Sequence, residues 1–225
     1  MLTTVWSVKG GAGCTVVSVA IAVMRARRDG RCVLVDLAGD LPAALGLPEP
    51  GGPGVTDWLA AADSEADSLS RLLVDVRSDL QLLPVGGSSS WPTERSDRLV
   101  DALRRLGVAV VIDAGHIEGG SCDRTAVTSL QGVGRHLRDA GTSTMVIRPC
   151  YLALRRAVAV RASADGVVLV TEVGRALDRR DVGDVLGLPV TAVVDVDPAV
   201  ARSIDSGLFV RRLPKAIERQ LRGAA

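Results

Sequence analysis

Short runs of aliphatic and β-branched residues alternate along this chain with longer stretches of helical periodicity, and this alternation limits its fold more than any other feature. Seven runs are almost continuously hydrophobic, which is typical of parallel strands buried on both faces of a sheet. They are residues 2–8, 32–36, 80–85, 108–113, 144–147, 166–171 and 190–194. Helices are expected at residues 15–28, 92–105, 151–162, 180–186, 198–206 and 214–222. The alternation predicts an α/β fold, a doubly wound and mainly parallel sheet with helices on both faces.

The length of 225 residues suits one domain with a hydrophobic core of its own, and we expect residues 1–225 to form a single domain. Hydrophobic residues make up 47% of the chain and charged residues 24%, which excludes a disordered tail or a fibre. Residues 42–68 contain Pro and Gly and are expected to be loop with short helices. Residues 86–91 are expected to form a flexible loop.

The cysteines and the hydropathy pattern bear on where the protein works. Cysteines stand at positions 14, 32, 122 and 150 without a CxxC pair, which argues against a zinc knuckle or a disulfide framework and fits a reducing interior. No apolar run approaches the roughly 18 residues that a membrane span needs. We therefore expect a cytoplasmic protein with no membrane span.

The charge balance is too even to predict a nucleic-acid or membrane partner. Twenty-seven basic residues face 26 acidic ones, a net charge of +1. Arginines gather at residues 25–28, 155–156, 179–180 and 211–212, where they could contact DNA phosphates. Acidic residues stand close to these groups, so we interpret them as solvated helix faces, and DNA is the less favoured partner. The apolar stripe of residues 211–222 is thin, which favours a docked helix over a membrane-binding tail.

A glycine-rich turn directly after the first expected strand is the strongest chemical motif of the chain. It runs Lys9-Gly10-Gly11-Ala12-Gly13-Cys14-Thr15 and opens the first expected helix. Glycines let successive backbone N–H groups point at an anion, and the helix N-terminus adds partial positive charge. The Thr15 hydroxyl stands where a Mg²⁺ ligand is needed. The turn predicts a phosphate site; tight packing of strand against helix is the structural alternative.

Two aspartates end buried strands at the edge where doubly wound sheets bind ligands. They are Asp36 and Asp113, and helix capping is the structural alternative for their side chains. Asp40 is interpreted as a helix cap and not as a catalyst. His116 and His136 are too far apart in the sequence to suggest a metal pair.

The turn from Lys9 to Thr15 resembles the deviant Walker A motif, KGGxGK[TS], of the ParA/MinD group of P-loop ATPases. Residues 34–47 are similar to the second acidic motif of that family, and residues 110–113 look like its Walker B strand. Residues 194–207 resemble the segment that packs on the adenine. The resemblance covers nearly the whole chain, and its three motifs occur in the family's order.

This resemblance implies a single nucleotide-binding domain that takes ATP or ADP with Mg²⁺. The phosphates would be cradled by Gly10, Gly11, Ala12, Gly13, Cys14 and Thr15, and the adenine would lie by Asp197 and Pro198. Thr15 and Asp113 would hold the metal, and Asp36 would orient or activate the attacking water. Lys9 would reach across a nucleotide-sandwich homodimer to the partner's phosphates. It is one of only two lysines in the chain, against 25 arginines, which supports a functional role.

The chain departs from the motif at Cys14, where the family has the P-loop lysine that grips the β- and γ-phosphates. Loss of that charge predicts weak or absent hydrolysis. A helix N-terminus can lower a thiol pKa, but no neighbouring residue supports a nucleophile, so we interpret Cys14 as a small residue in the place of the lysine. A small residue here resembles the TadZ/CpaE-like branch, which positions pilus and secretion machinery.

We therefore expect a nucleotide-binding switch or scaffold that positions a cellular machine. Its partners would be a second copy of the chain and another protein, for which a secretion or pilus ATPase is one candidate. Two alternatives stay open at this point. One is an active ATPase that partitions DNA or another cargo, and the other is a pseudo-ATPase that binds no nucleotide and serves as an interaction module.

Overall fold

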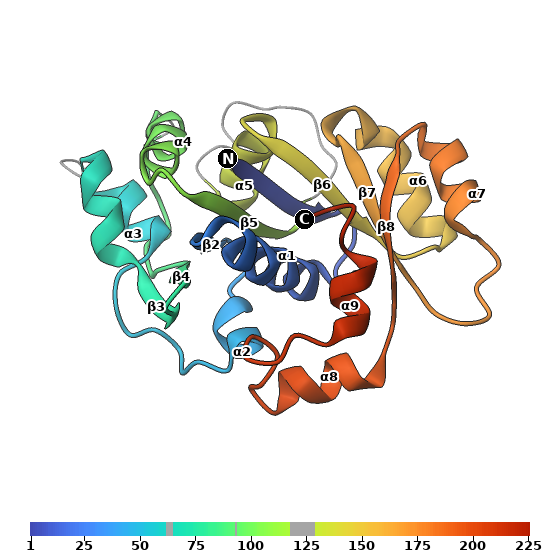
Figure 1. The fold of residues 1–225 in the computed structure, drawn as a ribbon. Helices are drawn as coiled ribbons and strands as arrows, with labels where there is room; N and C mark the ends of the chain where they lie inside the picture. Colours follow the sequence, from blue (N-terminus) through green and yellow to red (C-terminus); the bar gives the residue numbers. More distant parts are fainter. Residues whose placement is uncertain (62–64, 93, 118–128) are drawn as a thin grey trace.

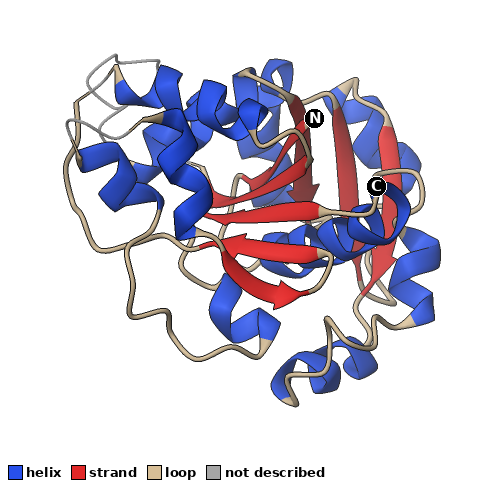
Figure 2. Ribbon diagram, turned by 60° about the vertical axis from the view of Figure 1, so that its left-hand side comes forward, coloured by secondary structure: helices blue, strands red, loops and turns tan. Residues whose placement is uncertain are grey.

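The computed structural model describes residues 1–61, 65–92, 94–117 and 129–225, in which helices flank one sheet (Figures 1 and 2). The strands are β1 (Leu2–Ser7), β2 (Cys32–Asp36), β3 (Val74–Arg77), β4 (Leu80–Leu83), β5 (Ala109–His116), β6 (Thr142–Ile147), β7 (Gly166–Thr171) and β8 (Val190–Asp195). Their order across the sheet is β3-β4-β2-β5-β1-β6-β7-β8. Only the edge strand β3 pairs antiparallel among these strands. The predicted fold class is confirmed.

The helices cover both faces of this sheet, as Figure 2 shows. They are α1 (Cys14–Asp29), α2 (Leu41–Leu45), α3 (Val55–Ala60), α4 (Arg95–Arg105), α5 (Leu130–Asp139), α6 (Tyr151–Val160), α7 (Arg179–Leu186), α8 (Pro198–Asp205) and α9 (Lys215–Gln220), with the 3-10 turns η1 (Ala66–Leu72) and η3 (Arg161–Ser163). Alternate strand residues feed two separate cores, because successive side chains of a strand point to opposite faces. Trp6 and Val110 pack with α3 to α7, whereas Val5 and Val111 pack with α1, α2 and the C-terminal helices.

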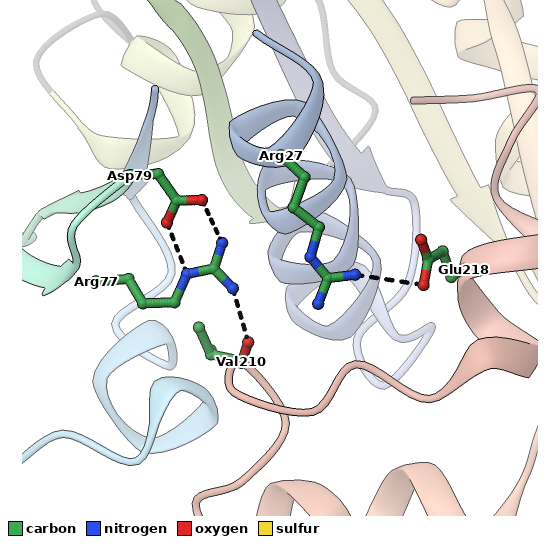
Figure 3. Close-up of polar contacts among 5 residues, drawn as sticks. All are labelled: Arg27, Arg77, Asp79, Val210 and Glu218. Carbon is green, nitrogen blue, oxygen red and sulfur yellow. Dashed lines mark hydrogen bonds and ion pairs between the residues drawn. The ribbon is translucent and has the colours of Figure 1, made fainter. Parts of the chain in front are cut away.

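The C-terminal segment is tied to the rest of the fold at two places (Figure 3). Arg77 of the β3–β4 hairpin pairs with Asp79 and donates a 3.2 Å hydrogen bond to the carbonyl oxygen of Val210. Arg27, in the last turn of α1, pairs with Glu218 of α9 at 3.3 Å. The predicted docked helix is confirmed by the burial of Leu213, Ile217 and Leu221 among α1 and its neighbours.

Two elements were not expected from the sequence. Helix α5 is capped by the Ser129 hydroxyl, which accepts a 3.1 Å hydrogen bond from the Gly132 N–H. Its Gly134 packs closely, since a Cβ there would lie 3.3 Å from the Ala114 Cβ. Strand β3 is a four-residue edge strand with alternating polarity. The described part of residues 42–68 contains most of α2, all of α3 and the start of η1, which confirms loop with short helices there.

The described residues also bear on the expectations about a membrane span, the cysteines and the arginine groups. None of their helices is long and apolar enough to cross a membrane. Cys14, Cys32 and Cys150 have free thiols, while Cys122 lies outside the described ranges. The solvated-face interpretation of residues 25–28 is wrong for Arg25, which is buried and donates a 2.7 Å hydrogen bond to the Thr3 hydroxyl.

Candidate functional site

The glycine-rich turn connects β1 to α1 at the carboxyl edge of the sheet. Lys9, Gly10 and Gly11 are exposed, and the backbone turns through positive φ at Gly11 (73°) and Gly13 (98°). Gly13 is the N-cap of α1 and has no side chain that could satisfy the first N–H groups of the helix. These groups have no partner within a helix, so they are available to an anion placed over the turn. The geometry therefore suits an anion, and the phosphate site stays a prediction.

Asp113 and Thr15 form the part of the site that fits a metal ion. The Asp113 carboxyl is fully buried; Oδ1 accepts a 3.2 Å hydrogen bond from the Gly115 N–H, and Oδ2 has no hydrogen-bond partner in the described residues. Burial raises the pKa of Asp113 to about 7, partly offset by the neighbouring Thr15 hydroxyl. An unpartnered carboxylate oxygen beside a hydroxyl is a hard oxygen donor set that Mg²⁺ prefers. The residues present therefore fit the ion.

Asp36 lies directly opposite Asp113 in the register of β2 and β5, and both stand at the strand ends where the sequence places them. Its Oδ1 accepts hydrogen bonds from the N–H groups of Ala38 (3.0 Å) and Gly39 (2.7 Å), and its Oδ2 accepts one from Leu41 (3.2 Å). Burial raises the pKa of Asp36 against these three bonds. Both oxygens thus hold the turn that leads into α2. The catalytic role of Asp36 stays a prediction.

The capping role expected of Asp40 is not seen. Asp40 occupies the N-cap position of α2, but its side chain makes no capping hydrogen bond. Asp36 satisfies the Leu41 N–H in its place. The capping alternative considered for Asp36 therefore describes its contacts, while the exposed Asp40 carboxyl faces solvent and adds negative charge near Asp113.

The Cys14 side chain is buried and lines neither of the two cavities beside the turn. It is buried beside Ser7 and Asp113. Burial raises the pKa of the Cys14 thiol well above its usual value, the Asp113 charge raises it further, and the Ser7 hydroxyl opposes both. A neutral buried thiol is a poor nucleophile. The interpretation of Cys14 as a small residue in the place of a lysine stays a prediction.

Two cavities flank the glycine-rich turn. The first has a volume of about 290 Å³, and its lining includes Lys9, Gly10, Gly11, Arg148, Cys150 and Arg175. The second, of about 210 Å³, is mainly apolar, and its lining includes Gly13, Val17, Arg148, Val170, Asp197 and Ile204. The first cavity has three cationic residues and no acidic one in its lining. The pair suits an elongated ligand with one apolar end and one anionic end.

Of the two residues predicted to lie by an adenine, Asp197 lines the second cavity and Pro198 does not. Asp197 lines the second cavity, and its Oδ1 caps α8 by accepting a 2.7 Å hydrogen bond from the Ala199 N–H. Pro198 begins α8, is exposed, and does not belong to the lining of that cavity. Most of the apolar wall comes from valines of β7 and β8 and from Val200, Ile204 and Ile217.

Lys9 is exposed at the tip of the turn. Its ammonium group makes no hydrogen bond or ion pair with any residue that the structure describes, and only its backbone carbonyl is engaged, by the Ser7 hydroxyl at 2.9 Å. The side chain is therefore free to reach a group outside this chain. The Nε2 atom of His116 lies 3.1 Å from the carbonyl oxygen of Val8, directly before the turn. His136 contacts Asp97, so the two histidines have different partners and do not form a metal pair.

Sequence reasoning missed a charged cluster at the same sheet edge. Each carboxylate oxygen of Glu172 accepts a hydrogen bond from one arginine. Arg148 Nη1 lies 3.0 Å from Oε1, and Arg175 Nη2 lies 2.9 Å from Oε2. Arg148 lines both cavities. Arg148 and Glu172 each directly follow a predicted strand, at 144–147 and 166–171. The strand-end rule that selected Asp36 and Asp113 would have found them.

Comparison with known proteins agrees with this geometry at the level of the fold. No family model matches the sequence, and no curated protein matches it. The structure is similar to the cell division protein MinD of Aquifex aeolicus, with a TM-score of 0.72, 18% identity, and coverage of 100% of this chain and 97% of that one.

Two further solved structures have a similar fold. A ParA family ATPase from Chlorobium tepidum TLS gives a TM-score of 0.74 at 17% identity, covering 98% of this chain and 96% of its own. The septum site-determining protein MinD from Pyrococcus horikoshii OT3, complexed with Mg-ADP, gives a TM-score of 0.70 at 19% identity, covering 97% of this chain and 91% of its own. The chain therefore has the fold of the MinD and ParA-family ATPases.

Proposed function

We propose that this chain binds ATP or ADP together with Mg²⁺ and acts as a nucleotide-dependent switch or scaffold that positions a cellular machine. The observation that carries the proposal is the unpartnered, buried Oδ2 of Asp113 beside Thr15, at the N-terminus of α1. A buried carboxylate oxygen without a partner is costly unless a ligand satisfies it. A hydrated cation that also binds phosphates is the ligand that this arrangement suits.

Each part of the site has a role in this proposal. The backbone N–H groups from Gly10 to Thr15 bind the phosphates, and the apolar second cavity receives the base. Thr15 and Asp113 hold the Mg²⁺, which neutralises phosphate charge when it is bound. The Pyrococcus horikoshii MinD of the same fold is a complex with Mg-ADP, which supports this choice of ligand.

Weak or absent hydrolysis is part of the same proposal. The buried thiol of Cys14 supplies no charge to a phosphate, and both oxygens of Asp36 are engaged by backbone N–H groups. Phosphoryl transfer depends on positioned charge, so a site with these features favours binding over turnover. Asp36 would have to give up a backbone hydrogen bond to orient a water molecule.

The switch is proposed to be a homodimer in its nucleotide-bound state. The free ammonium group of Lys9, at an exposed tip beside a cationic cavity, is placed to reach phosphates of a second copy. A further protein, of which a secretion or pilus ATPase is an example, would bind this dimer in the cytoplasm. DNA stays the less favoured partner.

Thermal melting with and without Mg-ATP, Mg-ADP and EDTA tests nucleotide binding, with phosphate release followed in the same samples. A ligand at about 100 times its Kd adds about 2.7 kcal/mol of stability, which raises the Tm of a domain of this size by about 5 to 10 °C. Thr15→Val is the matched variant, because it keeps the shape of the side chain and removes the hydroxyl. It should lose the Mg²⁺-dependent part of the Tm shift.

The outcomes separate the competing functions. A Tm shift with little phosphate release supports the switch. A shift with steady release favours the active ATPase, and no shift at millimolar nucleotide favours an interaction module that binds none.

A further inference from the structure

Arg148 is the residue that joins the two cavities beside the glycine-rich turn. It directly follows β6, and it lines both the cationic cavity with Lys9 and Gly11 and the apolar cavity with Gly13. Its Nε is buried and has no hydrogen-bond partner in the described part of the chain. Its Nη1 pairs with Glu172 at 3.0 Å. The guanidinium group thus has unused donor capacity next to the proposed phosphate site.

The turn itself has a shortage of positive charge that an arginine in this place would correct. Cys14 supplies no charge and lines neither cavity, and Lys9 is exposed at the tip. An arginine has five N–H donors in a fixed plane and binds phosphate through two of them at once. A phosphate near Gly13 would offer Arg148 a more highly charged acceptor than the single carboxylate of Glu172.

We propose that Arg148 is the phosphate-binding cation of this site and takes over the charge that the turn lacks at Cys14. Glu172 holds Arg148 in the nucleotide-free protein. When nucleotide binds, Arg148 exchanges the Glu172 carboxylate for a phosphate, and Glu172 keeps its second partner, Arg175. This inference rests on the proposed nucleotide binding and names the residue that makes it depend on the phosphates.

The exchange is inexpensive because the ion pair that it breaks is half-exposed. The side chains of Arg148 and Glu172 are 41% and 38% exposed, and pairs of this kind contribute little to stability. Glu172 does not become an isolated charge, since Arg175 Nη2 remains 2.9 Å from its Oε2. The pair therefore competes with phosphate without excluding it.

Isothermal titration of adenosine, Mg-ADP and Mg-ATP into the wild type and four variants tests the proposal. Arg148→Ala should weaken Mg-ADP and Mg-ATP about 10- to 100-fold, the loss expected for hydrogen bonds to a charged group, and leave adenosine binding unchanged. Arg148→Lys should recover part of the loss. Glu172→Gln should bind Mg-ADP as tightly as the wild type or a few-fold more tightly, because it releases Arg148.

Arg155→Ala is the matched control, since it removes an exposed arginine of α6 that lines neither cavity. It should bind all three ligands like the wild type. Wild-type affinity of Arg148→Ala for Mg-ADP, or an equal loss for adenosine, would overturn the phosphate role of Arg148 while nucleotide binding itself stands.

Two further outcomes decide the cases in which Arg148→Ala does not fold or the wild type binds no ligand. If Arg148→Ala does not fold, Glu172→Gln decides: a tenfold loss of Mg-ADP affinity in that variant contradicts the exchange. If the wild type binds neither adenosine nor Mg-ADP at millimolar concentration, the proposed function fails and the role of Arg148 falls with it.

Discussion

Replacing Asp113 by Asn should stabilise the nucleotide-free protein at pH 8 and have much less effect at pH 5. Burial raises the pKa of Asp113 to about 7, so the folded protein holds a proton between about pH 4 and pH 7 that the unfolded chain has lost. The unfolded state binds fewer protons in this window, and the stability of the wild type therefore falls as the pH rises through it. The full cost of the buried charge is about 4 kcal/mol above pH 7, from about 1.4 kcal/mol per pKa unit.

Asparagine mimics the protonated acid and does not pay this cost. Its Oδ1 can keep the hydrogen bond from the Gly115 N–H, and its amide nitrogen takes the position of the unpartnered Oδ2. The free energy of unfolding of Asp113→Asn should exceed that of the wild type by about 1.5 kcal/mol at pH 5 and by about 4 kcal/mol at pH 8. Asp36 is present in both proteins, so its own titration largely cancels in the difference.

Urea unfolding in EDTA without nucleotide, at one-unit steps from pH 5 to pH 8, measures this difference. Asp101→Asn is the control, because it removes an exposed carboxyl of α4 whose contact to Arg104 spans 3.9 Å. The control should stay within about 0.5 kcal/mol of the wild type at every pH. A stability gain for Asp113→Asn that does not grow with pH, or a loss at pH 8, would refute the argument that a buried, unpaired charge occupies this position.

Three further predictions concern the turn and its surroundings. Lys9→Ala should leave the urea midpoint unchanged, because the exposed ammonium group makes no hydrogen bond or ion pair in the described residues, yet abolish ATP-dependent dimerisation; a dimer of wild-type size by light scattering would contradict the role of Lys9. Cys14→Lys should raise phosphate release at least about tenfold by restoring charge at the phosphates, and unchanged turnover would place the limit elsewhere, for example at Asp36. Gly46→Ala should destabilise by more than about 2 kcal/mol, since a Cβ at this positive φ would lie 2.7 Å from the Gly207 Cα, whereas Gly30→Ala, at positive φ with open space, should cost only about 1 kcal/mol in the same urea series.

The strands of the central sheet were predictable because burial on both faces leaves a continuous hydrophobic signal. Helix α5 was missed for a physical reason: Gly132 and Gly134 lower its helix propensity, while in the structure Gly134 packs closely against Ala114. Strand β3 has four residues, and at an edge of the sheet its hydrophobic signal is weak.

The site was predictable to the extent that it follows from the ends of parallel strands. That rule puts Asp36 and Asp113 at the same edge of the sheet as the turn that begins at Lys9, and the structure shows the two aspartates opposite each other. The three backbone hydrogen bonds to Asp36 depend on the path of the chain from Ala38 to Leu41, which no spacing encodes. The position of Arg148 between two cavities likewise emerges only when β6 and β7 are placed beside the turn.

The wall of the apolar cavity has a consequence for how the site comes into being during synthesis. Ile204 and Ile217 line this cavity, and both are translated after every strand of the sheet. The turn proposed to bind phosphates is therefore translated before the residues that would complete the pocket for the base. Under the proposed function, tight nucleotide binding would require that the segment held by Arg27 and Arg77 has docked, so an occupied site would indicate that the C-terminal segment is in place.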